Sequence, residues 1–562
     1  MALATERTAA ARDLAWPNIS PLGLVLAGAF FGASLTPSLM PRDPMLLGVL
    51  GGVVAAIGHE IGGGLQWIWR FFGMPVGRRS AKGPIRLAAA AIGLALAVFA
   101  LTRVTGWQNA TRAVTGAAPV ESSYPMEVAG IAAVFLVALW LVFRLIGWAI
   151  RRVTGLLSRG LPPRVGAVIG TALVLVLVWT AVQRSVLRSF MEAANASFAA
   201  ADARIEPDIP QPRAPEKTGS PASLVKWNEM GRWGRSYIAT VPTREEISAF
   251  FGAGAADPIR VYVGRGAAPT ARERARIALD EMIRVGAFER SAIIVTVPVG
   301  TGWMDPGGHD TVEFMLGGDV ATVAVQYSYL TSVLSLIDDS SKGIEQAREL
   351  FNLVYDYWHE LPRDQRPEFY VHGLSQGAFN TEATLPLLDM LGNPIQGALW
   401  AGSPFFSPLW ANVRDRRDPE SPVWRPRWGN GSLVRTMNQE GGLDGEFLDG
   451  DFAPWGPTRL VFLNYGSDPI VLFTFDSAFR PPAFLNEPRA PDVSPRLRWF
   501  PVVTMLQLAL DTAIALETPG YGHFYIAPDY ITGWAAVVDP PGWSPERAEA
   551  LRRIFEARPA PF

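Results

Sequence analysis

Ser375 lies in the stretch YVHGLSQGAFN, which places it between Gly373 and Gly377 in the pattern G-x-S-x-G. The chain contains 54 glycines, so the pattern alone is weak evidence for a nucleophile. Its flanks say more, because an apolar run typical of a buried strand precedes the serine and apolar residues at helical spacing follow it. A strand, a tight turn and a helix form the context in which this motif presents a nucleophilic serine. We therefore expect Ser375 to be a nucleophile.

A serine nucleophile needs a base to accept its proton, and the chain offers five histidines. His59 lies in an apolar run, His359 within a helical pattern, and His372 on the strand before the turn, where packing or a backbone partner is expected. His309 precedes the serine, whereas His523 follows it in the glycine-flanked segment GYGHFY. Hydrolases with this motif have the chain order serine, acid, histidine. His523 is therefore the predicted base.

The acid that orients the histidine should follow a strand that lies between the serine and the histidine in the sequence. The run RLVFLNYGSDP supplies Asp468 directly after an apolar strand, which its proline cannot continue. Asp476, Asp449 and Asp451 are alternatives, but none follows an apolar run so directly. The sequence therefore predicts Asp468 as the acid that orients His523.

An acyl-transfer site also needs two N–H donors for the oxyanion. The residue after the nucleophile, Gln376, provides one of them in enzymes with this motif. The second comes from a loop after an earlier strand, and PVGTGW (298–303) is such a loop. Its glycines allow the backbone to turn inward, so Thr301 or Gly302 is the expected second donor.

Strand-like and helix-like runs alternate after residue 235, which predicts an α/β domain with a mainly parallel sheet. The strand-like runs are 259–264, 291–299, 320–328, 368–373, 397–404 and 459–468, and helix-like runs include 270–285 and 342–361. Ser375 then lies at the carboxyl end of a central strand, where open α/β sheets place their chemistry. The segment 405–457 interrupts the pattern with Trp410, Trp424, Trp428 and Trp455. It forms either a cap over the serine or an ordinarily packed small subdomain.

Five apolar runs precede residue 190, and each is close to the roughly 20 residues that a membrane-spanning helix requires. They are 21–40, 44–69, 85–103, 126–148 and 165–185. We expect residues 1–190 to form a transmembrane helical domain of about five spans, residues 191–234 a Pro-rich linker and residues 235–562 the catalytic domain. The linker would let a detached catalytic domain keep its activity on soluble esters and lose most of it on lipid in vesicles.

Basic residues are concentrated in two of the four loops that join these runs, and neither of these loops contains an acidic residue. The basic residues are Arg70, Arg78, Arg79, Lys82 and Arg86 in one loop and Arg144, Arg151, Arg152, Arg159 and Arg164 in the other. Such loops remain cytoplasmic. The sequence thus predicts a multi-pass protein of the cell membrane with a cytoplasmic N-terminus and an extracytoplasmic catalytic domain.

His59 and Glu60 are ionisable residues within the second apolar run, where such groups tend to face a cavity or the interior of a helical bundle. They form a candidate site in the membrane domain, although no second histidine follows at the spacing of a zinc motif. No metal or cofactor is expected. The formal net charge of -2 gives no indication of nucleic acid binding, and the absence of cysteine is compatible with an oxidising compartment. Nothing in the sequence specifies an oligomeric state.

The elbow HGLSQG, the acid after VFLNYGSD and the histidine in GYGHFY resemble the α/β-hydrolase superfamily over roughly residues 235–545. With SLTPSLMPRD between the first two runs, the whole chain is similar to a bacterial family of membrane-anchored α/β-hydrolases. The resemblance implies a serine esterase of the cell envelope, and some relatives are associated with hydrolysis of aminoacyl-phosphatidylglycerol. The loop VGTGW lacks the HGGG pattern of many lipases, which bears on the second oxyanion donor.

These observations favour a membrane-tethered serine hydrolase that cleaves a lipid ester, with a membrane lipid and the bilayer as its partners. A transacylase that uses the same triad to acylate an envelope lipid or glycan is the alternative. A second alternative is a membrane transporter or scaffold without catalysis, which the ordered serine, acid and histidine disfavour.

Overall fold

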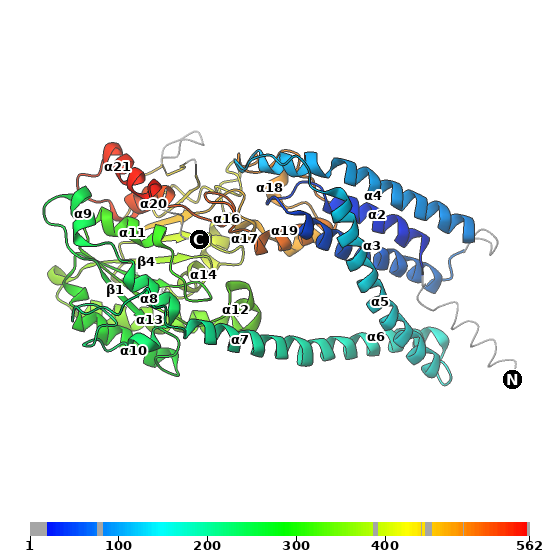
Figure 1. Cartoon of the computed structure of the whole chain (residues 1–562), viewed down its shortest axis with the longest axis horizontal. Helices are drawn as coiled ribbons and strands as arrows, with labels where there is room; N and C mark the ends of the chain where they lie inside the picture. The colour runs from blue at the N-terminus through cyan, green and yellow to red at the C-terminus, as the bar shows by residue number, and fades with distance from the viewer. Residues whose placement is uncertain are drawn as a thin grey trace. The chain divides into compact units, whose positions relative to one another are not determined.

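The computed structural model describes residues 19–75, 82–385, 392–439, 441–443, 452–486 and 488–558 (Figure 1). The chain divides into two compact units. The helical unit consists of residues 1–190, 473–486 and 491–514, and the sheet unit consists of residues 191–472, 487–490 and 515–562. Two segments of the expected catalytic domain, 473–486 and 491–514, therefore pack with the N-terminal helices.

The N-terminal helices begin close to the starts of the apolar runs. They are α2 (Pro21–Ser34), α3 (Pro44–Phe71), α4 (Lys82–Arg112), α5 (Pro125–Leu157) and α6 (Pro163–Ala181), which continues through a π-helical turn, Val182–Leu187, into α7 (Arg188–Asp202). Proline occupies the first turn of α2, α3, α5 and α6, where its missing N–H would have no helical partner. Among the described residues, four helices are long and apolar enough to cross a membrane: α3, α4, α5 and the run Pro163–Asp202.

The first apolar run gives a shorter helix than the expected span. Helix α2 has 14 residues, or about 21 Å at about 1.5 Å per residue, which is less than the roughly 30 Å of a hydrocarbon core. It ends at Ser34 because Thr36 precedes Pro37, and a residue before proline disfavours the helical conformation. The count of about five spans thus becomes four candidate spans and one short apolar helix.

Small residues allow close packing in the helical unit, as in other membrane helices. A Cβ at Gly28 of α2 would lie 2.1 Å from the carbonyl oxygen of Gly93 in α4, and a Cβ at Gly62 of α3 would lie 2.4 Å from the backbone of Gly23. The most apolar part of α3 is 61% buried, whereas that of α5 is 6% buried. The apolar surface of α5 thus faces outward, which fits a membrane-anchored arrangement.

The segment 191–234, expected to be a linker, is ordered in the structure. Helix α7 occupies its first part, and Trp227 and Met230 are buried in the core of the sheet unit. Arg235 donates hydrogen bonds to the backbone oxygens of Asp202 and Arg204. Proline and charge gave this segment the composition of a coil, but its few large apolar residues are enough to attach it to the core.

The sheet unit contains a seven-stranded sheet in the order β1-β3-β2-β4-β5-β7-β6, in which every neighbouring pair is parallel. The strands are β1 (Ile259–Val263), β2 (Ala292–Val297), β3 (Val320–Val325), β4 (Glu368–Leu374), β5 (Gly397–Ala401), β6 (Val434–Met437) and β7 (Arg459–Leu463). All of the expected strands are present. The parallel α/β architecture predicted from the alternating pattern is confirmed, with β4, the strand before Ser375, at the centre.

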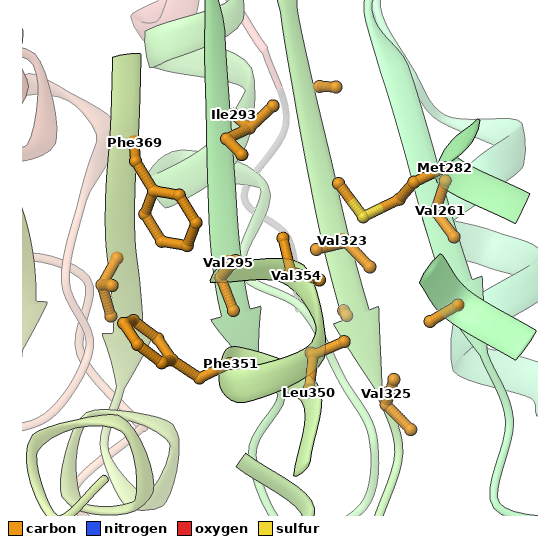
Figure 2. Packing of buried hydrophobic residues seen from close by; sticks show 14 of the residues in the cluster. Val261, Met282, Ile293, Val295, Val323, Val325, Leu350, Phe351, Val354 and Phe369 are labelled. Carbon is orange, nitrogen blue, oxygen red and sulfur yellow. The ribbon is translucent and has the colours of Figure 1, made fainter. Parts of the chain in front are cut away.

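Helices cover both faces of the sheet (Figure 1). They are α8 (Gly231–Ala239), α9 (Arg244–Phe251), α10 (Ala271–Arg284), α11 (Pro306–Met315), α12 (Ser332–Asp339), α13 (Ser341–Glu360), α14 (Gln376–Glu382), α16 (Pro408–Asp415), α17 (Pro469–Leu472), α20 (Ala527–Val538) and α21 (Pro545–Glu556). One core packs α10 and α13 against the sheet, with Met282 beside Val261 of β1 and with Leu350 and Phe351 also facing the sheet (Figure 2). The second core packs α11, α20 and α21 against the other face.

The segment 405–457 contributes to the sheet unit instead of standing apart from it. Within its described residues it forms α16 and the edge strand β6, which pairs with β7. Trp410 and Trp424 are buried, and the Arg435 guanidinium lies 4.0 Å from the centre of the Trp455 ring. For these three tryptophans the structure favours ordinary packing over a cap that admits an acyl chain.

Candidate active site

Ser375 occupies a strained turn between β4 and α14. Its φ of 56° and ψ of -121° lie in a region that residues other than glycine rarely adopt. The turn is fixed by a hydrogen bond of 2.9 Å from the Ser375 N–H to the carbonyl oxygen of Ala401. A Cβ at Gly377 would lie 2.2 Å from the Val297 oxygen, and one at Gly373 would lie 2.5 Å from the Ala378 nitrogen. The two glycines of the motif are therefore required by close backbone approach.

Asp468 and His523 form the ion-pair contact expected of an acid and its base. His523 Nδ1 lies 2.6 Å from Asp468 Oδ2, and both side chains are buried. The other oxygen, Oδ1, accepts the Ile470 N–H at 2.8 Å, since Asp468 caps the short helix α17. Ser467 Oγ accepts the Gly522 N–H at 3.1 Å, which ties the histidine loop to the end of the acid loop. The hydrogen bond leaves Nε2 as the nitrogen that faces away from the acid.

Ser375 and His523 both border the carboxyl end of β5. Ala401, the last residue of that strand, binds the Ser375 N–H, and the next residue, Gly402, packs against the His523 imidazole. His523 Nε2 is buried and makes no hydrogen bond within the described part of the chain, the Ser375 hydroxyl included. Catalytic hydrogen bonds are often long without substrate and shorten when it binds. The arrangement leaves Nε2 available to a proton donor.

Tyr525 is a residue of the site that the sequence did not reveal. Its hydroxyl donates to Asp468 Oδ2 at 2.7 Å, so the oxygen that binds His523 has a second donor. Burial raises the pKa of the Tyr525 phenol well above its usual value, and the Asp468 carboxylate raises it further, so Tyr525 remains a donor at neutral pH. Its position two residues after His523 in GYGHFY was the available signal.

In the loop after β2, one of the two candidates for the second oxyanion donor is already committed to another hydrogen bond. The Gly302 N–H donates to the Val299 oxygen at 2.8 Å in a tight turn, so it is already committed. The Gly300 N–H lies 3.3 Å from Ser332 Oγ. Thr301 accepts a side-chain hydrogen bond from Gln326 at its carbonyl, while its N–H makes no hydrogen bond to another described residue. Thr301 remains the candidate second donor with Gln376, the first residue of α14.

The remaining histidines and acids lie apart from this contact. His372 Nδ1 lies 2.7 Å from the Leu399 oxygen, and burial lowers the pKa of His372 to about 4. His309 is buried with its ring centre 5.0 Å from that of His372. Asp476 is exposed and pairs with Arg480 in the helical unit. The alternatives Asp449 and Asp451 lie outside the described residues.

Glu382, at the end of α14, is a buried carboxyl group that has no cationic partner among the described residues. It accepts hydrogen bonds from Ser403 Oγ at 2.6 Å and from the Trp410 N–H at 3.0 Å. Burial raises the pKa of Glu382 to about 8, and the hydrogen bonds from Ser403, Trp410 and the Leu409 N–H oppose the shift only in part. Glu382 joins the nucleophile helix to the loop that follows β5.

In the helical unit, His59 is buried in α3, and its Nδ1 lies 2.9 Å from Glu60 Oε1. The pair is the candidate membrane-domain site expected from the sequence, and its role stays a prediction. Across the residues that the structure describes, no group of three or more His, Cys, Asp or Glu side chains forms a metal site.

Two family models match the chain. Residues 259–551, more than half of the chain, match the model of the Alpha/beta-hydrolase family, and residues 35–242 match the model of the Alpha/beta-hydrolase family N-terminus. No curated protein and no solved structure matches the chain. The second model begins directly after α2 and extends past α8, so it includes the four candidate spans.

Proposed function

Because the chain belongs to the Alpha/beta-hydrolase family, we propose that it is a membrane-tethered serine hydrolase that cleaves a lipid ester of the cell envelope. The observation that carries the proposal is the 2.6 Å contact between His523 Nδ1 and Asp468 Oδ2, beside the strained turn that holds Ser375. A base oriented by a buried acid next to a serine on such a turn is the arrangement that acyl transfer requires.

In the proposed reaction, Ser375 Oγ attacks the ester carbonyl carbon while His523 Nε2 accepts the hydroxyl proton. Asp468 holds the imidazole tautomer and stabilises the imidazolium through Nδ1. The N–H groups of Gln376 and Thr301 bind the oxyanion. The imidazolium then gives its proton to the leaving alcohol, and a water molecule activated by the same nitrogen hydrolyses the acyl-enzyme.

The lipid substrate is proposed from the attachment of this site to apolar helices. In the part of the chain that the structure describes, four helices are long and apolar enough to cross a membrane, and their attachment would add nothing for a freely diffusing ester. The same argument supports a multi-pass location in the cell membrane. Aminoacyl-phosphatidylglycerol is our named candidate, and it rests on the resemblance to membrane-anchored relatives.

A fluorophosphonate probe on the purified full chain tests the chemistry. We expect labelling of Ser375, and we expect Ser375→Ala to lower turnover of a p-nitrophenyl ester by at least about 10³-fold without loss of folding. Ser340→Ala, which removes an exposed serine of the same unit, is the matched control and should leave both unchanged. Ester turnover that survives Ser375→Ala would exclude this serine as the nucleophile. Absence of both labelling and ester turnover in the wild type would instead favour the non-catalytic alternative.

The lipids of cells that carry Ser375→Ala test the substrate. We expect an aminoacylated or otherwise acylated lipid to accumulate. If a water-soluble ester or an acylated glycan changes instead, the lipid-hydrolase proposal fails and the transacylase replaces it, since both would use the same acyl-enzyme.

A further inference from the structure

Asp511, on α19 (Val503–Ala513), is a fully buried carboxylate in the helical unit and is paired with Arg42. Oδ1 accepts from Arg42 Nε at 3.0 Å and from Nη2 at 2.8 Å. Oδ2 accepts the Leu39 N–H at 3.1 Å and the Ser38 hydroxyl. Removing one partner of such a pair leaves an uncompensated buried charge, which is strongly destabilising. The pair therefore fixes α19 on the turn that follows α2.

This turn is the segment SLTPSLMPRD, residues 34–43, which none of the proposed chemistry uses. The guanidinium Nη1 of Arg42 also lies 3.3 Å from the Ser34 backbone oxygen, and the backbone N–H of Arg42 donates to Gln108 Oε1 at 2.9 Å. Gln507 lies one helical turn before Asp511, and its amide nitrogen lies 3.2 Å from the Ser34 oxygen. The segment is therefore shaped around one face of α19, and Val503 of the same helix packs with Leu50 and Val54 of α3.

The start of α19 is strained, which indicates that its position is tightly determined. Val502 has a φ of 65° and a ψ of -46°, a conformation that is unfavourable for a β-branched residue. The Val503 N–H lies 2.7 Å from the Pro501 oxygen, and the Val502 N–H donates to the Ala478 oxygen at 2.9 Å. Such a backbone persists only where the surrounding contacts over-determine it.

The end of α19 leads directly to the loop of the proposed base. In chain order, α19 lies between Asp468 and His523, and the helix ends at Ala513. Ala515, four residues after Asp511, accepts the His523 N–H at 2.8 Å. The residue that holds the backbone of His523 therefore follows the end of α19 by only two positions in the chain.

We propose that Arg42 and Asp511 are positioning residues for the hydrolase, because their ion pair holds the helix from which the His523 loop departs. This inference rests on the proposed function. It assigns the N-terminal helices a part in catalysis beyond anchoring. A chain that begins after residue 190 lacks both Arg42 and Ser38, so a detached catalytic domain should lose activity on soluble esters as well as on lipid.

The test uses the purified full chain in detergent, with p-nitrophenyl butyrate as a soluble ester and a fluorophosphonate probe for Ser375. For Asp511→Asn and for Arg42→Gln we expect kcat to fall by at least about 10-fold with little change in KM, because a base displaced by about 1 Å costs rate rather than binding. The labelling rate of Ser375 should fall in parallel. The double variant should lose less than the two single variants combined, because neither charge is then buried alone.

Asp43→Asn is the matched control, since Asp43 is the exposed neighbour that caps α3 and asparagine caps equally well. It should keep the wild-type kcat. Ser38→Ala removes one donor to Asp511 and leaves the ion pair intact. It replaces Asp511→Asn and Arg42→Gln as the test if those two variants do not fold. We expect its kcat to fall by about two- to fivefold.

Wild-type kcat in Asp511→Asn and Arg42→Gln, or in Ser38→Ala where those two do not fold, would overturn the inference. In the variants that fold, a loss of activity that only matches a lower fraction of folded protein, measured by size exclusion and circular dichroism, would also overturn it and leave a structural role. In both cases, a wild-type chain that labels at Ser375 preserves the proposed function. Absence of labelling in the wild type would instead reject the proposed function itself.

Discussion

Gly402 lies so close to His523 that a Cβ at residue 402 would stand 2.4 Å from the imidazole Cε1. Gly402 also has a φ of 57°, a left-handed conformation that disfavours other residues. The strand that binds the Ser375 N–H through Ala401 is thus followed by a glycine that forms one wall of the space for the proposed base. This contact sets a steric limit on where the imidazole lies.

We expect Gly402→Ala to lower kcat by about 10- to 100-fold with a smaller effect on KM, because the added methyl group displaces the imidazole. Ester turnover by the full chain measures the change. Gly429→Ala is the matched control, since Gly429 has a φ of 55° and would meet nothing within 4 Å. Equal losses in the two variants would assign the effect to backbone strain and contradict the steric explanation.

Tyr525→Phe should change how activity depends on pH. The phenol donates to the Asp468 oxygen that also binds His523, so its removal leaves more negative charge facing the imidazolium. The charged, inactive form of the base is then favoured, and the acidic limb of the kcat/KM profile should move to higher pH. Tyr355 lies on α13, and Tyr355→Phe removes a phenol hydrogen bond to the Asn393 backbone oxygen. This control variant should leave the pH profile in place. An unshifted profile in Tyr525→Phe would show that Tyr525 only packs.

Glu382 should make stability depend on pH. Its pKa is raised by burial to about 8, whereas the unfolded chain releases this proton near the ordinary value of 4.5. Between these two values the folded state binds more protons, so stability falls as pH rises, by at most about 1.4 kcal/mol per pH unit. We expect Glu382→Gln, which resembles the protonated acid, to remove this part of the decline.

The measurement is the apparent melting temperature of the full chain and its variants between pH 5 and pH 9. The advantage of Glu382→Gln over the wild type should grow towards pH 8 and then level off. Glu368→Gln, which changes an exposed carboxylate on β4, should follow the wild type at every pH. A constant difference between wild type and Glu382→Gln would mean that Glu382 is ionised throughout.

The central strands and the candidate triad were predictable because their signals are local. Apolar runs mark β2, β4 and β7, and the elbow around Ser375 is readable in five residues. The pair of Arg42 and Asp511 was not predictable, because 469 positions separate the two residues and each looks like an ordinary loop or helix residue. That the Gly302 N–H is not an oxyanion donor could be seen only from the turn in which it donates to Val299. Strand β6 was not predictable either, because it has only four residues and lies in a Pro- and Arg-rich segment.

The orientation of the helical unit is the last prediction. Basic residues remain at the ends of the candidate spans: Arg70 in the last turn of α3, Arg86 in the first turns of α4, Arg159 between α5 and α6, and Arg164 in the first turn of α6. Arg78 and Arg79 lie outside the described residues. These basic ends predict cytoplasmic connections after α3 and after α5. The chain after α6 then lies outside the cytoplasm, whether or not the short helix α2 spans the membrane.

Reporter fusions measure this arrangement. A reporter after residue 562 should be active only outside the cytoplasm, and one near residue 80 only inside. The side of the N-terminus depends on α2 alone: an extracytoplasmic N-terminus indicates the four spans of sufficient length, and a cytoplasmic one indicates that the 14 residues of α2 cross as well. Replacing Arg159 and Arg164 by glutamine should weaken the orientation, because the bias follows the basic residues rather than the net charge. A cytoplasmic signal from the reporter after residue 562 would contradict the topology and, with it, a site on the outer side of the membrane.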